Sequence, residues 1–205
     1  ELELGDYESA KADFDKAISM DPKNYDRLIE IYEALADYGY REVGQEYLQN
    51  VLNTDKKLDA YDSGRIYYYL GDYQKAYLAL EEAKGKGGVD SYLYLGKAYA
   101  ATGDYNYASS VYSNYLSKQG PDAEIYNQLG LCELAKKDYQ KALEAFQAGK
   151  QIEGNSLMQT LSFNEIVAYE YLQDYQKAAV LLKAYLQNYP DDQAAIREQQ
   201  FLSTR

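Results

Sequence analysis

Residues 70–83 read LGDYQKAYLALEEA, and this stretch decides the fold because it recurs along the chain. Copies of its Gly-Asp-Tyr-like opening motif begin at residues 5, 71, 103, 137 and 173, and a degenerate copy begins at residue 39. Successive starts are therefore 34, 32, 32, 34 and 36 residues apart. A period this regular predicts a solenoid, in which each repeated unit packs on its neighbours.

Each copy continues as an amphipathic helix. In the first copy, Ala10, Phe14 and Ala17 follow at three- and four-residue spacing, which places them on one helical face. Asp6 stands where a helix N-cap is expected, and Asp21 precedes a proline that disfavours further helix. The same pattern predicts helices over residues 6–20, 25–37, 41–53, 58–69, 73–84, 90–101, 105–118, 122–135, 139–151, 158–172, 175–189 and 191–202.

The glycine-rich stretch at residues 85–88 is predicted to be a loop between two of these helices. A phosphate-binding loop is excluded, because no strand precedes the stretch and no Gly-Lys-Ser/Thr sequence follows it.

Small residues recur at fixed places, which predicts close contacts between helices. Three glycines lie seven residues before a motif start, inside predicted helices: Gly64, Gly96 and Gly130. A mid-helix glycine costs about 0.5–1 kcal/mol relative to alanine, so we infer a compensating gain from closer packing. Alanines are assigned the same role on the second helix: Ala76, Ala108, Ala142 and Ala178. Large residues are expected to fill the space toward the following repeat: Phe14, Leu80, Tyr112, Phe146 and Leu182.

This arrangement resembles the tetratricopeptide repeat family. The resemblance covers nearly the whole chain and implies an all-α, right-handed superhelical solenoid of antiparallel helix pairs, with about twelve helices. It implies a single domain over residues 1–205, made of a half repeat 1–22, repeats 23–56, 57–88, 89–122, 123–156 and 157–190, and a capping helix 191–205. Three residues depart from the family pattern: Arg41 stands where tyrosine is expected, and Tyr32 and Ile166 stand where glycine is expected.

The chain is acidic, with a net charge of −12 and a pI near 4.5. Nucleic acid is disfavoured as a partner, because its phosphates would be repelled. No run approaches the ~18 apolar residues that a membrane span requires. The first repeat has no leading helix, so we expect a fragment of a longer chain, with any targeting segment upstream of Glu1. The sequence does not indicate a compartment.

Nothing in the sequence indicates catalysis, a metal or a cofactor. The chain has no histidine, which removes the commonest general base and the commonest metal ligand. Its one cysteine, Cys132, lies within a predicted helix and has no basic partner in local reach. We interpret it as a small buried hydrophobe, and we expect a non-enzymatic protein.

Tyrosine dominates the aromatic residues, with 26 tyrosines against 4 phenylalanines and no tryptophan. Most are interpreted as residues at the seams between helices, with each hydroxyl reaching water or a carbonyl at the edge. The alternative is that some line a binding surface, where a rigid amphipathic ring contributes contact area at small entropic cost.

The resemblance also implies a binding groove, because in this family the first helix of each repeat lines a concave surface that holds ligands. The implied groove residues are two cations among aromatic and amide side chains: Tyr61, Arg65, Tyr68, Tyr94, Lys97, Asn127, Gln128 and Asn164. We predict that they hold a protein or peptide segment, with the cations binding acidic or carbonyl groups. The alternative is that Arg65 pairs internally with Asp62. Lys97 would then pair with Asp90 or Glu133, since exposed ion pairs are common.

A second class of function stays open from the sequence: a structural or self-assembly module of a larger protein. In that case the groove, or the open N-terminal face, would be covered by the protein's own chain or by a second copy in a homo-oligomer. Phe14 and its neighbours lack a covering helix in this sequence, which favours this alternative.

Overall fold

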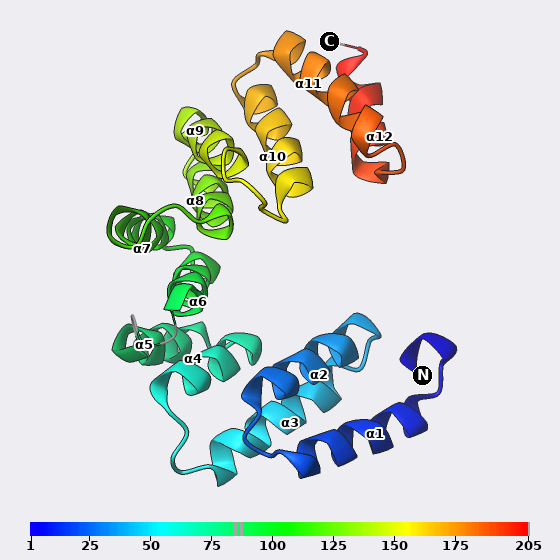
Figure 1. Ribbon diagram of the computed structural model, residues 1–205, viewed down its shortest axis with the longest axis vertical. Helices are drawn as coiled ribbons and strands as arrows, with labels where there is room; N and C mark the ends of the chain where they lie inside the picture. Colours follow the sequence, from blue (N-terminus) through cyan, green and yellow to red (C-terminus); the bar gives the residue numbers. More distant parts are fainter. Residues whose placement is uncertain (84–85, 87, 205) are drawn as a thin grey trace. The chain divides into compact units, whose positions relative to one another are not determined.

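The computed structural model describes residues 1–83, 86 and 88–204. These residues form twelve α-helices and one short 3-10 helix, and no β-strand occurs among them (Figure 1). The prediction of an all-α protein is confirmed. The chain divides into two compact units: unit 1 is Glu1–Gly87 and unit 2 is Gly88–Arg205.

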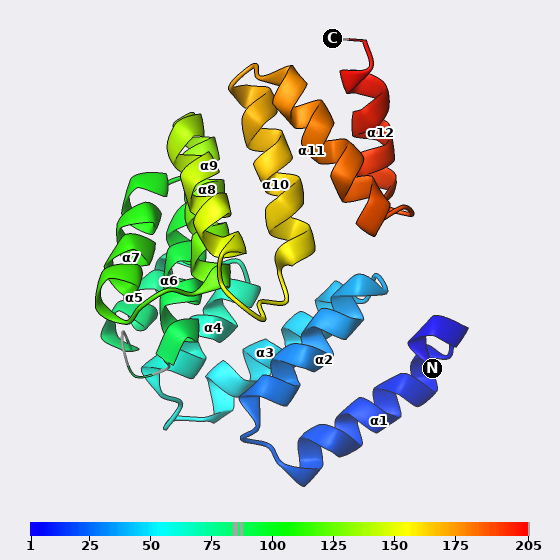
Figure 2. The ribbon, with the colours of Figure 1, turned by 45° about the horizontal axis from the view of Figure 1, so that its top comes forward.

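Unit 1 contains α1 followed by two helix pairs, α2/α3 and α4/α5, whose members pack against each other (Figure 2). Its elements are η1 (Leu2–Leu4), α1 (Tyr7–Met20), α2 (Tyr25–Asp37), α3 (Arg41–Thr54), α4 (Ala60–Tyr69) and α5 (Tyr73–Ala83).

Unit 2 contains three helix pairs, α6/α7, α8/α9 and α10/α11, and a last helix, α12, that packs against α11. Its elements are α6 (Gly88–Ala101), α7 (Tyr105–Lys118), α8 (Ala123–Ala135), α9 (Tyr139–Lys150), α10 (Met158–Tyr171), α11 (Tyr175–Asn188) and α12 (Gln193–Leu202).

All twelve predicted helices are present, and the described helix ends agree with the predictions to within two residues. The predicted loop at residues 85–88 is wrong at Gly88, which begins α6. Gly88 has a φ of 60°, which glycine adopts freely, and its carbonyl accepts a hydrogen bond from the Ser91 hydroxyl in the first turn (3.0 Å). Residues 84, 85 and 87, which include the predicted end of the helix before the loop, lie outside the described residues.

The first two residues of the motif have separate structural roles, and the third, the tyrosine, is the first residue of the helix that follows. The first ends the preceding helix in a left-handed conformation, with φ of 79° at Gly71 and 86° at Gly103. The second is an N-cap: the Asp104 carboxylate accepts a hydrogen bond from the Tyr107 N–H (3.0 Å). Equivalent caps are made by Asp6, Asp138 and Asp174. Such a cap contributes about 1 kcal/mol, so the recurrence of Gly-Asp-Tyr is explained by how each helix pair turns.

Lys137 and Gln173 occupy the left-handed position without being glycine, with φ of 64° and 62°. This conformation costs an L-residue about 1–2 kcal/mol, whereas glycine adopts it freely. We therefore expect Lys137→Gly to raise the free energy of unfolding by about 0.5–1 kcal/mol, less than the full strain because glycine also gains freedom in the unfolded chain. Urea denaturation followed by circular dichroism measures the change. The reverse substitution, Gly71→Lys, should lower stability; a destabilised Lys137→Gly variant would contradict this account.

Contacts between a glycine and a large side chain form the centre of three repeats. The pairs are Gly64 with Leu80, Gly96 with Tyr112, and Gly130 with Phe146. In each pair, a Cβ atom at the glycine would overlap the large side chain, so the predicted close approach is confirmed. The alanines assigned to such contacts are fully buried: Ala76, Ala108, Ala142 and Ala178. Leu80, Tyr112 and Phe146 contact the glycine of their own repeat. Phe146 and Leu182 also belong to buried clusters with residues of the following element, as the sequence interpretation expected: Phe146 with Leu161 and Ala168, and Leu182 with Ala195 and Leu202.

In the repeat over residues 23–56, the large and small partners exchange helices. Tyr32, in the glycine position, is 4% exposed, and Gly44 faces it from α3, where a Cβ atom would lie 3.2 Å from the Tyr32 Cα. Arg41, in the tyrosine position, donates a hydrogen bond from Nη1 to the Tyr32 hydroxyl (3.0 Å). These departures from the family pattern compensate one another, and the helix pair is retained.

Tyrosine hydroxyls join separate elements by donating hydrogen bonds to carboxylates. Four of these bonds, 2.5–2.6 Å long, are Tyr25 to Asp55, Tyr47 to Asp15, Tyr69 to Glu33 and Tyr185 to Asp192. Burial, together with the acceptor carboxylate, raises the pKa of Tyr25, Tyr47 and Tyr185 to about 12. These tyrosines lie at seams, as interpreted from the sequence, and their hydroxyls reach carboxylates. The Tyr112 hydroxyl instead donates to the Leu93 carbonyl (3.4 Å), as the sequence interpretation expected.

Candidate functional site

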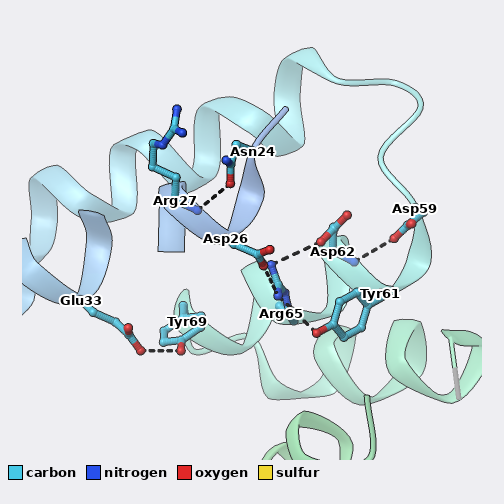
Figure 3. Close-up of polar contacts among 9 residues, drawn as sticks. All are labelled: Asn24, Asp26, Arg27, Glu33, Asp59, Tyr61, Asp62, Arg65 and Tyr69. Carbon is cyan, nitrogen blue, oxygen red and sulfur yellow. Dashed lines mark hydrogen bonds and ion pairs between the residues drawn. The ribbon is translucent and has the colours of Figure 1, made fainter. Parts of the chain in front are cut away.

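The candidate site in unit 1 lies on the first helices α2 and α4 and centres on Arg65 (Figure 3). Arg65 Nη1 donates hydrogen bonds to Asp26 Oδ1 (2.6 Å) and to the Tyr61 hydroxyl (3.2 Å). The guanidinium carbon lies 4.7 Å from the centre of the Tyr61 ring, a cation–π contact. A second carboxylate, that of Asp62, lies 3.4 Å from Nη2. One cation is therefore shared by two carboxylates and one aromatic ring.

The charged side chains of this site differ in exposure: 7% for Arg65, 20% for Asp62 and 75% for Asp26. Burial disfavours the charged form of Arg65, but hydrogen bonds to Asp26 and Tyr61 outweigh it, and the pKa of Arg65 is raised. Burial also raises the pKa of Asp62, although the charge of Arg65 opposes this. The buried cation is held charged by its neighbours, and Asp26 reaches it from the solvent side.

Tyr68, the third predicted site residue of unit 1, packs among other tyrosines. Its ring centre lies 5.4 Å from that of Tyr69 and 5.7 Å from that of Tyr73 on α5. The Tyr69 hydroxyl donates to Glu33 of α2 (2.6 Å), which gives α2 and α4 a second polar contact (Figure 3). Tyr68 thus contributes to the seam between the helices of its own repeat.

The candidate site in unit 2 lies on α6, α8 and α10, the first helices of three successive repeats. Lys97 Nζ lies 3.4 Å from Glu124 Oε1, and Gln128 Nε2 donates to the same oxygen (2.9 Å). Asn164 Nδ2 of α10 donates to Asn127 Oδ1 of α8 (2.9 Å). These five residues form what we call the polar strip of unit 2. The predicted site residues on these three helices are Tyr94, Lys97, Asn127, Gln128 and Asn164.

Both predicted cations have internal partners. Arg65 pairs with Asp62, as the alternative expected, and also with Asp26, which sequence reasoning missed. Lys97 pairs with Glu124, which was not among its expected partners. Both missed acids lie 13 residues before a motif start: Asp26 before residue 39 and Glu124 before residue 137. Each lies in the first turn of the first helix of its repeat. An acid there complements the helix dipole, and this recurring position is the signal that identifies both partners.

The described residues offer polar recognition chemistry. They contain no group of three or more histidine, cysteine, aspartate or glutamate side chains placed to hold a metal ion. Cys132 is buried, and burial, followed by the neighbouring charge of Glu133, raises the pKa of its thiol to about 11. The reactive thiolate is therefore scarce near neutral pH. Among the described helices, none is long and apolar enough to cross a membrane.

Comparison with known families supports the repeat assignment. Models of the tetratricopeptide repeat match residues 2–24, 93–156 and 163–192. No curated protein sequence matches the chain.

Several solved structures share the fold. YrrB, described as a TPR protein with an unusual peptide-binding site, is 21% identical, with a TM-score of 0.59 over 91% of this chain and 97% of that chain. TTC0263, a thermophilic TPR protein of Thermus thermophilus, is 15% identical, with a TM-score of 0.67 over 88% of this chain and 100% of that chain. The APC/C hetero-tetramer Cut9–Hcn1 is 17% identical, with a TM-score of 0.63 over 99% of this chain and 40% of that chain. At these identities the likeness shows the fold alone.

Proposed function

The chain belongs to the tetratricopeptide repeat family, and on this premise we propose that it is a non-enzymatic scaffold that binds an extended segment of a partner protein. The segment lies along the first helices of the repeats. The observation that carries the proposal is the polar strip of unit 2, in which side chains from three successive first helices contact one another. Polar side chains on three successive first helices match a ligand that runs across the repeats.

The chemistry of the polar strip suits a peptide backbone. Gln128 and Asn164 are partly exposed, and each carries both donors and acceptors on one amide group, so each can bond to a backbone carbonyl or N–H. Asn127 is 5% exposed and positions Asn164 by accepting its hydrogen bond. Lys97 is 31% exposed and shares its carboxylate partner with Gln128. It can therefore turn toward a carbonyl or an acidic side chain at little cost, because a partly exposed ion pair contributes little stability.

Binding of this kind is expected to be weak. The strip is already hydrogen-bonded internally, so a ligand exchanges hydrogen bonds and gains only the net difference, about 0.5–1.5 kcal/mol for each neutral bond and more for a charged one. We therefore expect a dissociation constant in the micromolar range, which corresponds to a binding free energy of about −8 kcal/mol.

The test is a fluorescent peptide array, followed by titration of the peptides that bind. We expect Lys97→Glu and Asn164→Ala each to weaken binding of those peptides by about tenfold, because each removes a group of the polar strip. Lys177→Glu, an exposed charge reversal on the second helix α11, is the matched control and should leave binding unchanged. Equal binding by all three variants would contradict the proposed surface, and an array without any bound peptide would contradict the proposed function.

A further inference from the structure

We propose that Arg65 is the binding position for a carboxylate of the bound segment, and that Asp26 fills this position while the segment is absent. This role of Arg65 depends on the proposed peptide-binding function and names the chemical group that unit 1 recognises. Asp26 thereby becomes an internal competitor for acidic ligands.

The geometry of the site distinguishes Asp26 from the other partners of Arg65. Tyr61 and Asp62 lie on α4, the same helix as Arg65, and stay beside it however α2 moves. Asp26 reaches across from α2, and its side chain is 75% exposed although it contacts a cation that is 7% exposed. In Figure 3, Asp26 and Tyr61 approach the guanidinium from different sides. The position that Asp26 occupies at Nη1 therefore opens to solvent.

The energetics of exchange favour a carboxylate as the incoming group. Replacing the carboxylate of Asp26 by another carboxylate leaves the net charge around Arg65 unchanged. Asp26 returns to water without a large penalty, because its side chain is already mostly hydrated. Arg65 remains enclosed by Tyr61 and Asp62 and stays pre-organised, which limits the entropy lost on binding. The guanidinium presents a rigid set of donors that match a carboxylate.

The first test uses a short labelled peptide of alternating glutamate and alanine, with its glutamine analogue as the neutral probe. Asp26→Asn removes the competing charge and should tighten binding of the acidic peptide about fivefold, the equivalent of one exposed ion pair. The glutamine analogue should bind both proteins equally. Asp90→Asn is the matched control, because Asp90 is an exposed acid at the same repeat position in α6, and it should change nothing.

A second measurement uses acetate and needs no peptide. Melting temperatures are recorded in sodium acetate and in sodium chloride of equal ionic strength. Asp26→Asn should be stabilised by acetate relative to chloride, because acetate enters the vacated position. The double variant Asp26→Asn with Arg65→Gln, and the Asp90→Asn control, should not respond. Asp26→Ser serves as a second vacated variant should the asparagine variant fold poorly.

The outcomes separate this proposal from the proposed function. If wild-type protein binds the acidic peptide and Asp26→Asn binds it equally or more weakly, Asp26 is no competitor, although peptide binding stands. If no variant binds the peptide, binding of this peptide class fails and the acetate measurement decides alone. An acetate response confined to the Asp26 variants that retain Arg65 supports the carboxylate position, and the absence of such a response overturns it.

Discussion

Replacing Gly96 with alanine is expected to lower the free energy of unfolding of unit 2 by about 1–3 kcal/mol, as overpacked cores do. A Cβ atom at residue 96 would overlap the ring of Tyr112 on α7. Tyr112 is fully buried, and its hydroxyl donates to the Leu93 carbonyl (3.4 Å), so the ring has no free space to enter. The intrinsic preference of a helix for alanine over glycine, about 1 kcal/mol, would by itself stabilise the variant. A net loss of stability therefore has to come from the overlap with Tyr112.

Two further variants isolate the steric cause. Gly149→Ala makes the same change in α9, where the added Cβ would meet flexible Leu161 methyl groups at 3.0 and 3.1 Å, and it should cost less. Adding Tyr112→Leu to Gly96→Ala removes the ring atoms that overlap and should recover part of the loss. Urea denaturation followed by circular dichroism measures all three variants. A Gly96→Ala protein as stable as the parent would show that α6 and α7 separate easily, against the close approach described here.

The helices were predictable because their signals are local. The N-cap at Asp104 and the left-handed turn at Gly103 depend on residues within one helical turn, and each recurs in register with the motif. In the repeat over residues 23–56, the large residue Tyr32 lies on the first helix and the small residue Gly44 on the second. The sequence showed this only as a departure from the family pattern at Tyr32. Its compensation depends on how α2 faces α3, which no local window contains.

The internal contacts of the candidate sites could be predicted only in part from the sequence. The family resemblance implied Lys97, Asn127, Gln128 and Asn164 as residues of first helices, and in the structure each of them contacts another member of the polar strip, which also includes Glu124. The partners of the cations were not predicted correctly, because Asp26 and Arg65 are separated by 39 residues. The choice among nearby acids depends on the packing of α2 against α4. Arg65 was expected on the groove surface and is instead 7% exposed, since Tyr61 and the carboxylates enclose it.

A pair of carboxyl groups should make unit 2 less stable as the pH rises toward neutrality. Glu170 of α10 is half-buried, and its carboxyl group hydrogen-bonds with that of Glu198 of α12. Its Oε1 atom is buried without a hydrogen bond among the described residues. Burial, followed by the charge of Glu198, raises the pKa of Glu170 from 4.5 to about 7. Two carboxyl groups can share a hydrogen bond only while one of them is protonated, so the contact between α10 and α12 is strongest in acid.

The direction of the effect follows from proton binding. Between pH 4.5 and about 7, the folded protein retains a proton that the unfolded chain has lost, so stability falls as the pH rises. The full effect is about 1.4 kcal/mol for each pH unit. Glu170 is only partly buried and solvent reduces this value, so we expect a total loss of about 1–2 kcal/mol. Aspartates with lowered pKa values, such as Asp192, lose their contribution only at lower pH.

Glu170→Gln should abolish this pH dependence. The amide cannot ionise and donates a hydrogen bond to Glu198, so the variant should be more stable than the parent at about pH 8 and similar to it at about pH 5. Glu144→Gln on α9 is the matched control, because it removes one exposed glutamate charge without touching α12. Urea denaturation of the three proteins at both pH values measures the effect. If the parent and Glu170→Gln lose stability equally between the two pH values, Glu170 does not retain its proton in the folded protein. The carboxyl pair of Glu170 and Glu198 is then not the source of the pH dependence.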